Sequence, residues 1–252
     1  MNIRRRIVLI FSIAMIISLN GCSHFNMLVQ KESGSADNLV EGFKHVALAS
    51  VADAVDQVVG EPGFMNHDMR PVVGKGFVGR ATTTLFRPAS KFDKAAALSI
   101  HHATEMIDNA EVGEVGVIVV EDGLNIAGIG GLMATAAVSR GMAGVVVDGG
   151  VRDIDEINRL GLNVFGRGIT SATAVNRYST IGRDIQVNCA GVIVNPGDII
   201  IAKTDGVVRV PKDKAEEVLR VAQEIDVRET KMVPFIKKNK SIQKAVEEFN
   251  RI

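Results

Sequence analysis

The chain has 252 residues, of which 46% are hydrophobic, and its 29 basic and 29 acidic side chains cancel to a formal charge of zero. A chain of this length can bury the core of one full domain. The balanced charge argues against a nucleic-acid partner, because proteins that bind nucleic acids usually present a strongly basic face. The basic run at 237–240 fits a solvated helix face better than a binding patch.

The N-terminus has the pattern of a secretory signal. Three arginines at 4–6 precede the apolar run Ile7–Leu19, which is shorter than the roughly 20 residues that span a bilayer. The segment LNGC that ends at Cys22 resembles a bacterial lipobox, in which the cysteine is lipidated and becomes the mature N-terminus. We therefore expect residues 1–21 to be a lipoprotein signal peptide and Cys22 to attach the chain to a membrane. An ordinary signal peptide, or a short anchor with an incidental cysteine, is the alternative.

Loss of this signal would change the charge and the surroundings of the chain. It removes three arginines and no acid, which leaves 26 basic and 29 acidic side chains and a formal charge of −3. The mature chain is expected in the cell envelope, facing the periplasm, and Ser23 after the cysteine suggests the outer membrane over the inner one. Cys189 would then have no partner for an intramolecular disulfide, and it fits core filling better than a nucleophile.

In chain order, the sequence predicts a tether, one domain and a helical arm. Residues 22–38 have few apolar groups and suggest the tether, and the domain is expected over residues 39–227. Three β-branched runs alternate with helical patterns there, which implies parallel strands joined by right-handed crossovers. The expected strands are Val115–Val120, Gly144–Asp148 (followed by a turn at Gly149-Gly150) and Leu162–Phe165, and the expected helices are Leu132–Arg140, closed by Gly141, and Ile154–Leu160, closed by Gly161.

After Gly168 the pattern changes to short strands with turn signals between them, which predicts a small β layer. The expected strands are Ile185–Cys189, Gly191–Val194, Asp198–Ala202 and Gly206–Val210. Two helices should follow, Lys212–Ile225 and Thr230–Phe249, the second amphipathic and basic. Residues 228–252 are expected to form an arm for a neighbouring subunit.

The most informative segment is Gly128–Asp153, which has the pattern of two consecutive strand-to-helix turns that meet at one site. Together with segments before and after it, it resembles the family of regulator of ribonuclease activity A and the 4-hydroxy-4-methyl-2-oxoglutarate aldolases (the RraA-like family). The resemblance extends from about Leu48 to Arg220. The matching segments are Ala52–Asp56, Gly141–Asp153 (GMAGVVVDGGVRD), Leu160–Phe165, Val194–Ala202 (VNPGDIIIA) and Asp205–Pro211.

The resemblance implies an α/β fold, a three-layer β/β/α swivelling domain with C-terminal helices, assembled as a homotrimer or hexamer with sites between subunits. It also implies a metal-dependent lyase, an aldolase or oxaloacetate decarboxylase that releases pyruvate through an enolate. By position, Asp153 would bind Mg²⁺ or Mn²⁺, with waters completing the coordination. Arg152 would hold the carboxylate or keto oxygen of a small 2-oxo acid substrate. Gly130, Gly131, Leu132 and Met133 would present backbone N–H groups to that substrate.

Gly131 departs from the family pattern. Family aldolases place Asp or Glu at that position, where the acid orders a metal-bound water for proton transfer, and glycine cannot do so. The resemblance therefore implies a lyase with impaired proton chemistry, unless a carboxylate from elsewhere, such as one across a subunit interface, substitutes for this acid. The alternative is a non-catalytic ligand- or protein-binding member of the family, anchored in the cell envelope.

Several of these residues have plainer interpretations. Asp153 and Glu156 form a D-x-x-E capping box, so Asp153 would then only cap a helix. Asp148 is either a supporting partner of the site or a strand-end turn residue. His101 and His102 suggest a metal site, but adjacent residues on a helix are expected to point apart.

A dinucleotide site is a further alternative. Gly128-x-Gly130, with an acid twenty residues after Gly128 at Asp148, mimics a dinucleotide-binding fingerprint. Met133 occupies the place of the third glycine, however, and a long loop after Val120 replaces the tight turn that this motif needs. The sequence therefore favours the lyase site over a nucleotide site.

Overall fold

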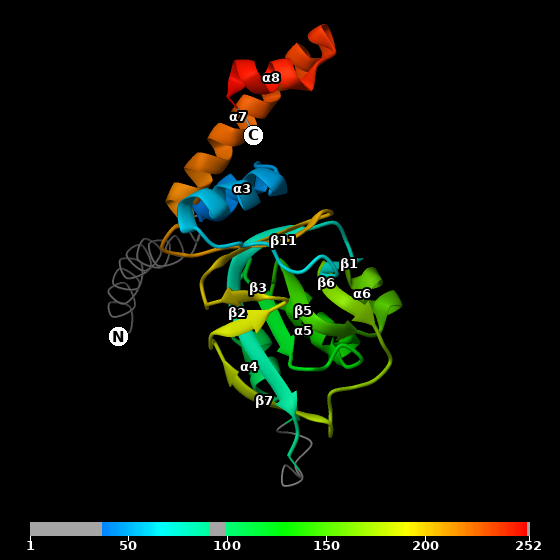
Figure 1. Ribbon diagram of the computed structural model, residues 1–252. Helices are drawn as coiled ribbons and strands as arrows, with labels where there is room; N and C mark the ends of the chain where they lie inside the picture. Colours follow the sequence, from blue (N-terminus) through cyan, green and yellow to red (C-terminus); the bar gives the residue numbers. More distant parts are fainter. Residues whose placement is uncertain (1–36, 91–98, 251–252) are drawn as a thin grey trace, which may run out of the picture. The chain divides into compact units, whose positions relative to one another are not determined.

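The computed structural model describes residues 37–90 and 99–250. From Asn38 onward the chain forms one compact unit (Figure 1). The predicted signal peptide, Cys22 and nearly all of the predicted tether lie outside the described residues. Within the described part of the chain, no helix has both the length and the apolar character needed to cross a membrane.

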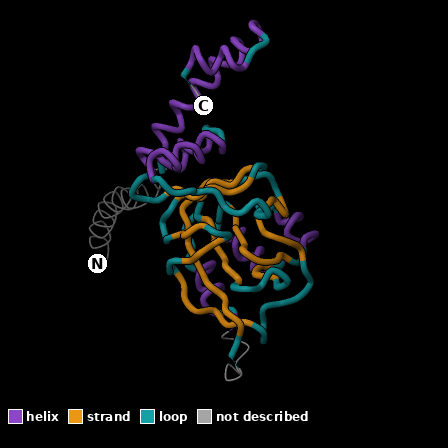
Figure 2. The backbone as a smooth tube through the Cα atoms, viewed as in Figure 1, coloured by secondary structure: helices purple, strands orange, loops and turns teal. Residues whose placement is uncertain are grey.

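The centre of the domain is a mixed sheet of nine strands, which curves around the core (Figure 2). Its order is β1-β6-β5-β3-β2-β10-β11, with β4 paired to β5 and β7 paired to β2. β3, β5 and β6 run parallel to one another, as the alternating pattern predicts, and β2, which the pattern does not predict, joins them in parallel beside β3. The strands are β1 (Arg70–Val73), β2 (Phe77–Pro88), β3 (Val115–Val120), β4 (Ala127–Ile129), β5 (Gly144–Val151), β6 (Val164–Ile169), β7 (Tyr178–Arg183), β10 (Ile199–Lys203) and β11 (Gly206–Val210).

Helices and a small β layer cover the two faces of this sheet. One apolar core lies between the sheet and the helices α4 (His101–Asp108), α5 (Gly131–Ser139) and α6 (Ile154–Leu160). A second core lies on the opposite face, under the hairpin of β8 (Val187–Cys189) and β9 (Val192–Val194). A third core packs α2 (Asn38–Lys44), α3 (Leu48–Val59) and the first half of α7 (Ala215–Asn239) against β10 and β11. The predicted α/β fold, with a helical layer, a β layer, a second small β layer and C-terminal helices, is confirmed. The assignment of Asp198–Ala202 and Gly206–Val210 to the small layer is wrong, because β10 and β11 continue the main sheet beside β2 and only β8 and β9 form the small layer.

The predicted turn at Gly149-Gly150 is wrong, because β5 continues through both glycines to Val151. A Cβ on Gly150 would lie 3.1 Å from the Ile126 carbonyl oxygen, and a Cβ on Gly149 would lie 3.0 Å from the Val120 side chain. Small residues are therefore needed where β4 approaches the end of β5, and the glycines mark close packing and not a chain reversal.

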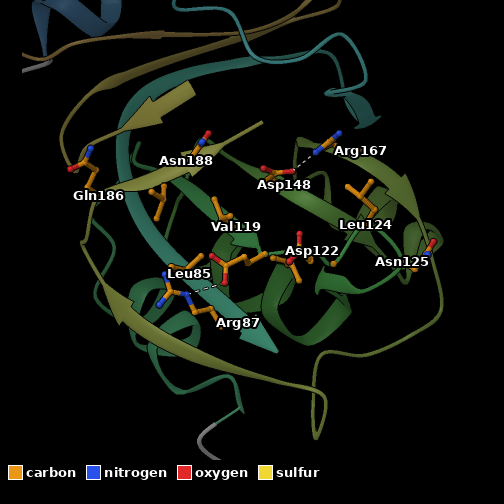
Figure 3. Close-up of a pocket in the computed structure, with 14 residues that line it drawn as sticks. Leu85, Arg87, Val119, Asp122, Leu124, Asn125, Asp148, Arg167, Gln186 and Asn188 are labelled. Atoms are coloured by element: carbon orange, nitrogen blue, oxygen red, sulfur yellow. Dashed lines mark hydrogen bonds and ion pairs between the residues drawn. The ribbon is translucent and has the colours of Figure 1, made fainter. Parts of the chain in front are cut away.

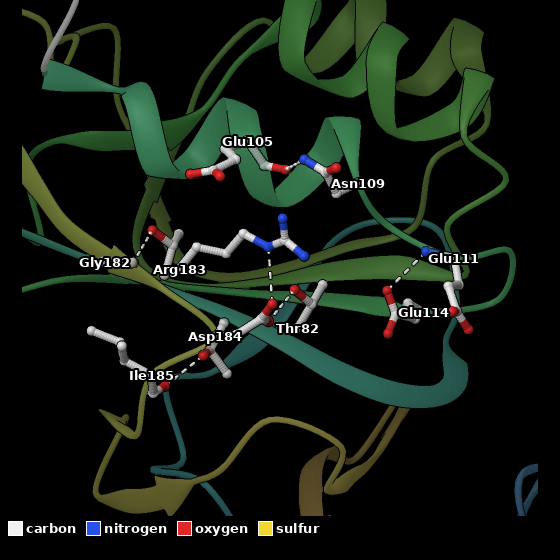
Figure 4. Close-up of polar contacts among 11 residues, drawn as sticks. Thr82, Glu105, Asn109, Glu111, Glu114, Gly182, Arg183, Asp184 and Ile185 are labelled. Carbon is white, nitrogen blue, oxygen red and sulfur yellow. Dashed lines mark hydrogen bonds and ion pairs between the residues drawn. The ribbon is translucent and has the colours of Figure 1, made fainter.

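β7, which the sequence pattern does not predict, is attached to β2 by a run of buried threonines (Figure 4). The hydroxyl of Thr82 donates to Asp184 over 2.7 Å, and the hydroxyl of Thr84 donates to the Gly182 carbonyl over 3.0 Å. Thr83 donates in the same way to the carbonyl of Ile185. These bonds satisfy the buried hydroxyls and hold the crossing strand in register.

The C-terminal helices also differ from the prediction. Instead of ending at Ile225 and restarting at Thr230, α7 is continuous over Ala215–Asn239, and α8 spans Ile242–Phe249. The break falls at Lys240, which has a positive φ of 50°, and the Ser241 side chain then accepts a bond from Lys244 N as the N-cap of α8. α8 packs against the end of α7, where the Phe235 and Phe249 rings meet edge to face with centroids 5.5 Å apart.

Cys189 is fully buried beside Met65, with 3.8 Å between the two sulfur atoms. Burial raises the pKa of the Cys189 thiol well above its ordinary value. A thiol that stays protonated and out of reach of solvent is not a nucleophile. The core-filling interpretation of this cysteine is therefore correct.

Candidate functional site

The two strand-to-helix turns predicted from the sequence lie side by side. β4 leads through Gly130 into α5, and β5 leads through Arg152 and Asp153 into α6. The two strands pair in parallel, and Arg152 N donates to the Ile129 carbonyl over 3.2 Å. Because the carboxyl ends of both strands meet at one edge, residues more than twenty positions apart face each other across a single site.

Asp153 is directed into this site by an unusual backbone conformation. Its φ is 57° and its ψ is 41°, the left-handed region that non-glycine residues rarely occupy. Asp153 stands at the N-cap of α6, but its side chain makes no capping bond there. Its Oδ2 instead accepts a hydrogen bond of 2.9 Å from Gly131 N, the first amide of α5. The simple capping-box interpretation therefore fails, and the strained backbone aims a carboxylate at the neighbouring turn.

Gly130 lets two charged side chains approach its backbone closely. A Cβ on Gly130 would lie 2.7 Å from Asp153 Oδ2 and 2.8 Å from Arg152 Nε, closer than real Cβ contacts allow. Arg152 Nε lies 3.7 Å from Asp153 Oδ2, a longer and weaker ion pair than a hydrogen-bonded one. Most of the guanidinium's hydrogen-bonding capacity is therefore free to bind an anion.

A cavity of about 320 Å³ opens beside these residues. That size suits a small metabolite. Arg152 and Asp153 lie in its wall, and the rest of the wall is mostly apolar. The other lining residues are Phe86, Ile100, Ala127, Gly128, Ile129, Gly130, Leu132, Met133, Thr173, Ala174 and Val175.

The first turn of α5 supplies amides to the same place. Gly131 N is bound to Asp153, while the amides of Leu132 and Met133 have no acceptor among the residues that the structure describes. Ala134 N is the first amide of the helix to bond within it, to the Gly130 carbonyl. Unpaired amides at a helix N-terminus, beside an arginine, favour a negatively charged ligand.

The predicted metal ligand Asp153 fits a hard divalent cation. Its side chain is 45% exposed, and its Oδ1 accepts no hydrogen bond from any described residue. Mg²⁺ and Mn²⁺ prefer oxygen ligands, and Mg²⁺ is often bound through one or two carboxylates with several waters retained. A single open carboxylate in a partly exposed site matches that preference.

A second group of metal-binding side chains lies at the start of α4. Potential ligand atoms of His101, His102 and Glu105 lie within 4.8 Å of one another, the one such group of three among the described residues. The expectation that the two histidines point apart is wrong, because their rings meet with centroids 5.1 Å apart. None of these three residues lines the cavity beside Asp153. His102 Nδ1 also lies 3.1 Å from the Thr180 carbonyl, which gives this histidine a structural role.

A larger cavity of about 740 Å³ lies on the opposite side of β5, around Asp148 and Arg167 (Figure 3). Asp148 does not support the Asp153 site. Its Oδ1 lies 3.0 Å from Arg167 Nη1, and its Oδ2 accepts a hydrogen bond from Ala190 N. The other arginine of this cavity, Arg87, is paired with Glu121. Since the cations there are already neutralised, the smaller cavity with its loosely paired Arg152 is the better anion site.

The comparison with known proteins identifies the family of the chain. The model of the RraA-like family, described as Aldolase/RraA, matches residues 48–209, more than half of the chain. The chain belongs to the RraA-like family.

Two relatives of this RraA-like protein illustrate the range of the family. Protein DlpA of Legionella pneumophila is 28% identical over 219 residues, which cover 86% of this chain and 35% of DlpA. A protein of Halalkalibacterium halodurans named "Putative 4-hydroxy-4-methyl-2-oxoglutarate aldolase" is 36% identical over 115 residues, which cover 45% of this chain and 54% of that protein. The matched part of this chain thus spans about a third to about half of the length of these relatives.

Solved structures show the same fold. An uncharacterized protein from Pseudomonas syringae pv. tomato superimposes with a TM-score of 0.75 and 24% identity, over 86% of this chain and 97% of that chain. RraAS2 of Streptomyces coelicolor, described as an unusual member of the RNase ES inhibitor RraA protein family, superimposes with a TM-score of 0.69 and 24% identity, over 78% of this chain and 96% of that chain.

Proposed function

We propose that this RraA-like protein is a divalent-metal-dependent lyase that releases pyruvate from a small 2-oxo acid, by aldol cleavage of a 4-hydroxy-2-oxo acid or by decarboxylation of oxaloacetate. The observation that carries the proposal is the left-handed Asp153, whose carboxylate leaves its capping position and faces the cavity beside Arg152. The aldolase name of the Halalkalibacterium halodurans relative supports the same reaction class.

Each group of the site has a task in that reaction. Asp153 would hold Mg²⁺ or Mn²⁺ through its open Oδ1. Arg152 would bind the substrate carboxylate, because a planar guanidinium matches a planar anion. The amides of Leu132 and Met133 would donate hydrogen bonds to the remaining negative charge, and the apolar wall would contact the rest of the substrate. When bound, such a cation supplies stabilisation of the negative charge that the enolate carries.

The test is pyruvate release by the full-length protein, purified in detergent, from oxaloacetate and from 4-carboxy-4-hydroxy-2-oxoadipate. Assays with Mg²⁺, with Mn²⁺ and with a chelator are run beside Asp153→Asn. The matched control is Asp155→Asn, which removes an exposed acid from the same helix. We expect Asp153→Asn to lower metal-dependent turnover at least about 100-fold and Asp155→Asn to change it less than about twofold.

Equal pyruvate release by the unsubstituted protein and by Asp153→Asn, with both folded, would contradict the proposal. Binding of Mn²⁺ that depends on Asp153, without turnover of either substrate, would instead support a ligand-binding member of the family.

We further propose that the chain acts as a lipid-anchored protein of the cell envelope, through Cys22, and that it assembles as a homotrimer or hexamer. The basic, apolar and cysteine pattern of the N-terminus supports the anchor. Cys22→Ser should move the protein from the membrane fraction to the soluble fraction, and equal fractionation of both forms would refute the anchor. Light scattering in detergent measures the size of the assembly.

A further inference from the structure

Glu156 occupies the space where a side chain of residue 131 would lie. Gly131 is the first residue of α5, its φ is not positive, and a side chain there is compatible with the helix. A Cβ on Gly131 would nevertheless overlap Glu156 Oε2 and lie 2.7 Å from Glu156 Cδ. The backbone conformation thus permits a side chain at residue 131, and such a side chain would require the flexible, exposed Glu156 carboxylate to move from its present position.

The Glu156 side chain does not have the structural role that its place in α6 predicts. In a capping box the glutamate at this position reaches back to the N-cap amide, here that of Asp153. No such bond is present, and the Glu156 carboxylate has no hydrogen-bond or ion-pair partner among the described residues. Two carboxylates that start α6 have both left their capping positions. Both lie beside Gly131. Asp153 Oδ2 accepts a hydrogen bond from Gly131 N, and the Glu156 carboxylate occupies the place where a Cβ of residue 131 would be.

This placement brings an exposed, unpaired carboxylate to the edge of the proposed site. Gly131 stands between Gly130 and Leu132, which both line the cavity. Glu156 is exposed to solvent, so its carboxylate can exchange a proton with water. It lies beside Gly131, whose amide is bound to Asp153. Glu156 is not itself among the residues that line the cavity, so its carboxylate lies beside the site and would act on a bound substrate over a short path, such as one water.

We propose that Glu156 is the proton-transferring carboxylate of this site, an inference that rests on the proposed lyase function. Directly or through one water, Glu156 accepts the proton of the substrate 4-hydroxyl group while the C3–C4 bond breaks. The electron pair of that bond passes into the pyruvate enolate, and the former C4 becomes a carbonyl carbon. Protonated Glu156 then returns the proton to C3, which gives pyruvate and regenerates the carboxylate.

Moving the carboxylate tests this assignment. Glu156→Gln keeps the size of the side chain and removes the base. The double variant Glu156→Ala/Gly131→Asp clears the space beside residue 131 and places a carboxylate there from the other side. Asp155→Asn is the matched control, because it removes a neighbouring exposed acid. Three properties are measured on the full-length protein: pyruvate release, exchange of the C3 protons of pyruvate with D₂O by NMR, and the Kd for Mn²⁺.

We expect Glu156→Gln to slow cleavage and proton exchange about 100-fold or more, while the Kd for Mn²⁺ changes less than about threefold. The double variant should be at least about tenfold more active than Glu156→Ala alone. Asp155→Asn should be as active as the unsubstituted protein. A purely structural role for Glu156 would lower the thermal stability and would not be rescued by a carboxylate at residue 131.

The outcomes separate the two proposals. If the unsubstituted protein cleaves substrate and Glu156→Gln does so within about threefold of its rate, the role of Glu156 is refuted and the lyase function stands. If the unsubstituted protein neither cleaves substrate nor exchanges the C3 protons above the level of Asp153→Asn, the lyase function fails and the role of Glu156 fails with it.

Discussion

Replacement of Arg167 by Met should expose how much of the stability of the sheet depends on one buried charge network. Arg167 Nη1 lies 3.0 Å from Asp148 Oδ1, and Arg167 Nη2 lies 2.7 Å from Asp68 Oδ2. The Arg167 side chain is 20% exposed and that of Asp148 only 13%. Met fills most of the same volume but leaves two carboxylates without their cation.

The expected loss follows from the burial of these groups. Breaking a fully buried pair by removal of one partner costs about 3–5 kcal/mol, and the partial exposure here reduces that figure to about 2–3 kcal/mol. For a domain of this size such a loss lowers Tm by roughly 4–12 °C. The matched control is Arg87→Met in the same cavity. Its pair with Glu121 is 3.0 Å long but 52% and 43% exposed, so about 0.5 kcal/mol or less is expected.

The loss should also depend on pH. The Arg167 guanidinium lowers the pKa of Asp68 below its ordinary value of 3.8. A carboxyl group with a lowered pKa in the folded state stabilises the fold above its unfolded pKa, and this contribution disappears as the pH falls through the folded pKa. The difference between the two proteins should therefore be full at pH 7 and shrink below about pH 4. Urea unfolding at several pH values measures it. A loss no larger than that of Arg87→Met, or one that is the same at every pH, would refute the reasoning.

Two further substitutions test packing and burial. Gly144→Ala should lower the free energy of unfolding by about 1–3 kcal/mol, because its Cβ would overlap the Phe77 ring and lie 2.7 Å from Phe77 Cγ. The control Gly168→Ala has open space around the new Cβ and should change the stability little. Equal Tm values for the two variants would contradict the close packing of Gly144 on Phe77. Glu114→Gln should raise Tm at pH 7 and increase the free energy of unfolding by less than about 1 kcal/mol (Figure 4). The reason is that burial raises the pKa of Glu114, so its ionisation is costly in the folded state. That gain should vanish as the pH falls below the ordinary pKa of 4.5, where both forms are neutral, and a gain that persists in acid would rule out this cause. The exposed Glu61→Gln, remote from Glu114 in the sequence, should show no gain at any pH.

The sequence predicts well those elements whose signals are local. Val115–Val120, Ile154–Leu160 and Gly206–Val210 have the predicted bounds, since each is a clear apolar run or helical pattern closed by turn residues. The missed strand β7 and the continuous helix α7 depend on distant contacts. β7 is held by hydroxyls on β2, about a hundred residues earlier. α7 continues past Ile225 where Asp226 accepts hydrogen bonds from Ala47 N and from the Ser50 hydroxyl, at the start of α3.

The same distinction holds for the site. The meeting of the two turns is predictable, because adjacent parallel strands bring their carboxyl ends together and both turns are visible in the sequence. The roles of Arg152 and Asp153 follow only from the family resemblance, since the residues alone favour a helix cap for Asp153. The far wall of the cavity is not, because Phe86 and the segment 173–175 reach it from other parts of the chain. No periodicity or spacing marks these residues as neighbours of Asp153.

Gly131 shows why a motif alone misjudges this site. In the sequence, a glycine in place of an acid indicates a lost function, and Glu156 indicates a helix cap. In the structure the two observations belong together, because the Glu156 carboxylate fills the space that the glycine leaves free. A side chain at residue 131 and the present position of Glu156 exclude each other, so a carboxylate can reach this place from either helix but not from both at once. What the sequence presents as a deletion is, in three dimensions, an exchange of which helix supplies the acid, and the paired substitution at 131 and 156 tests that exchange directly.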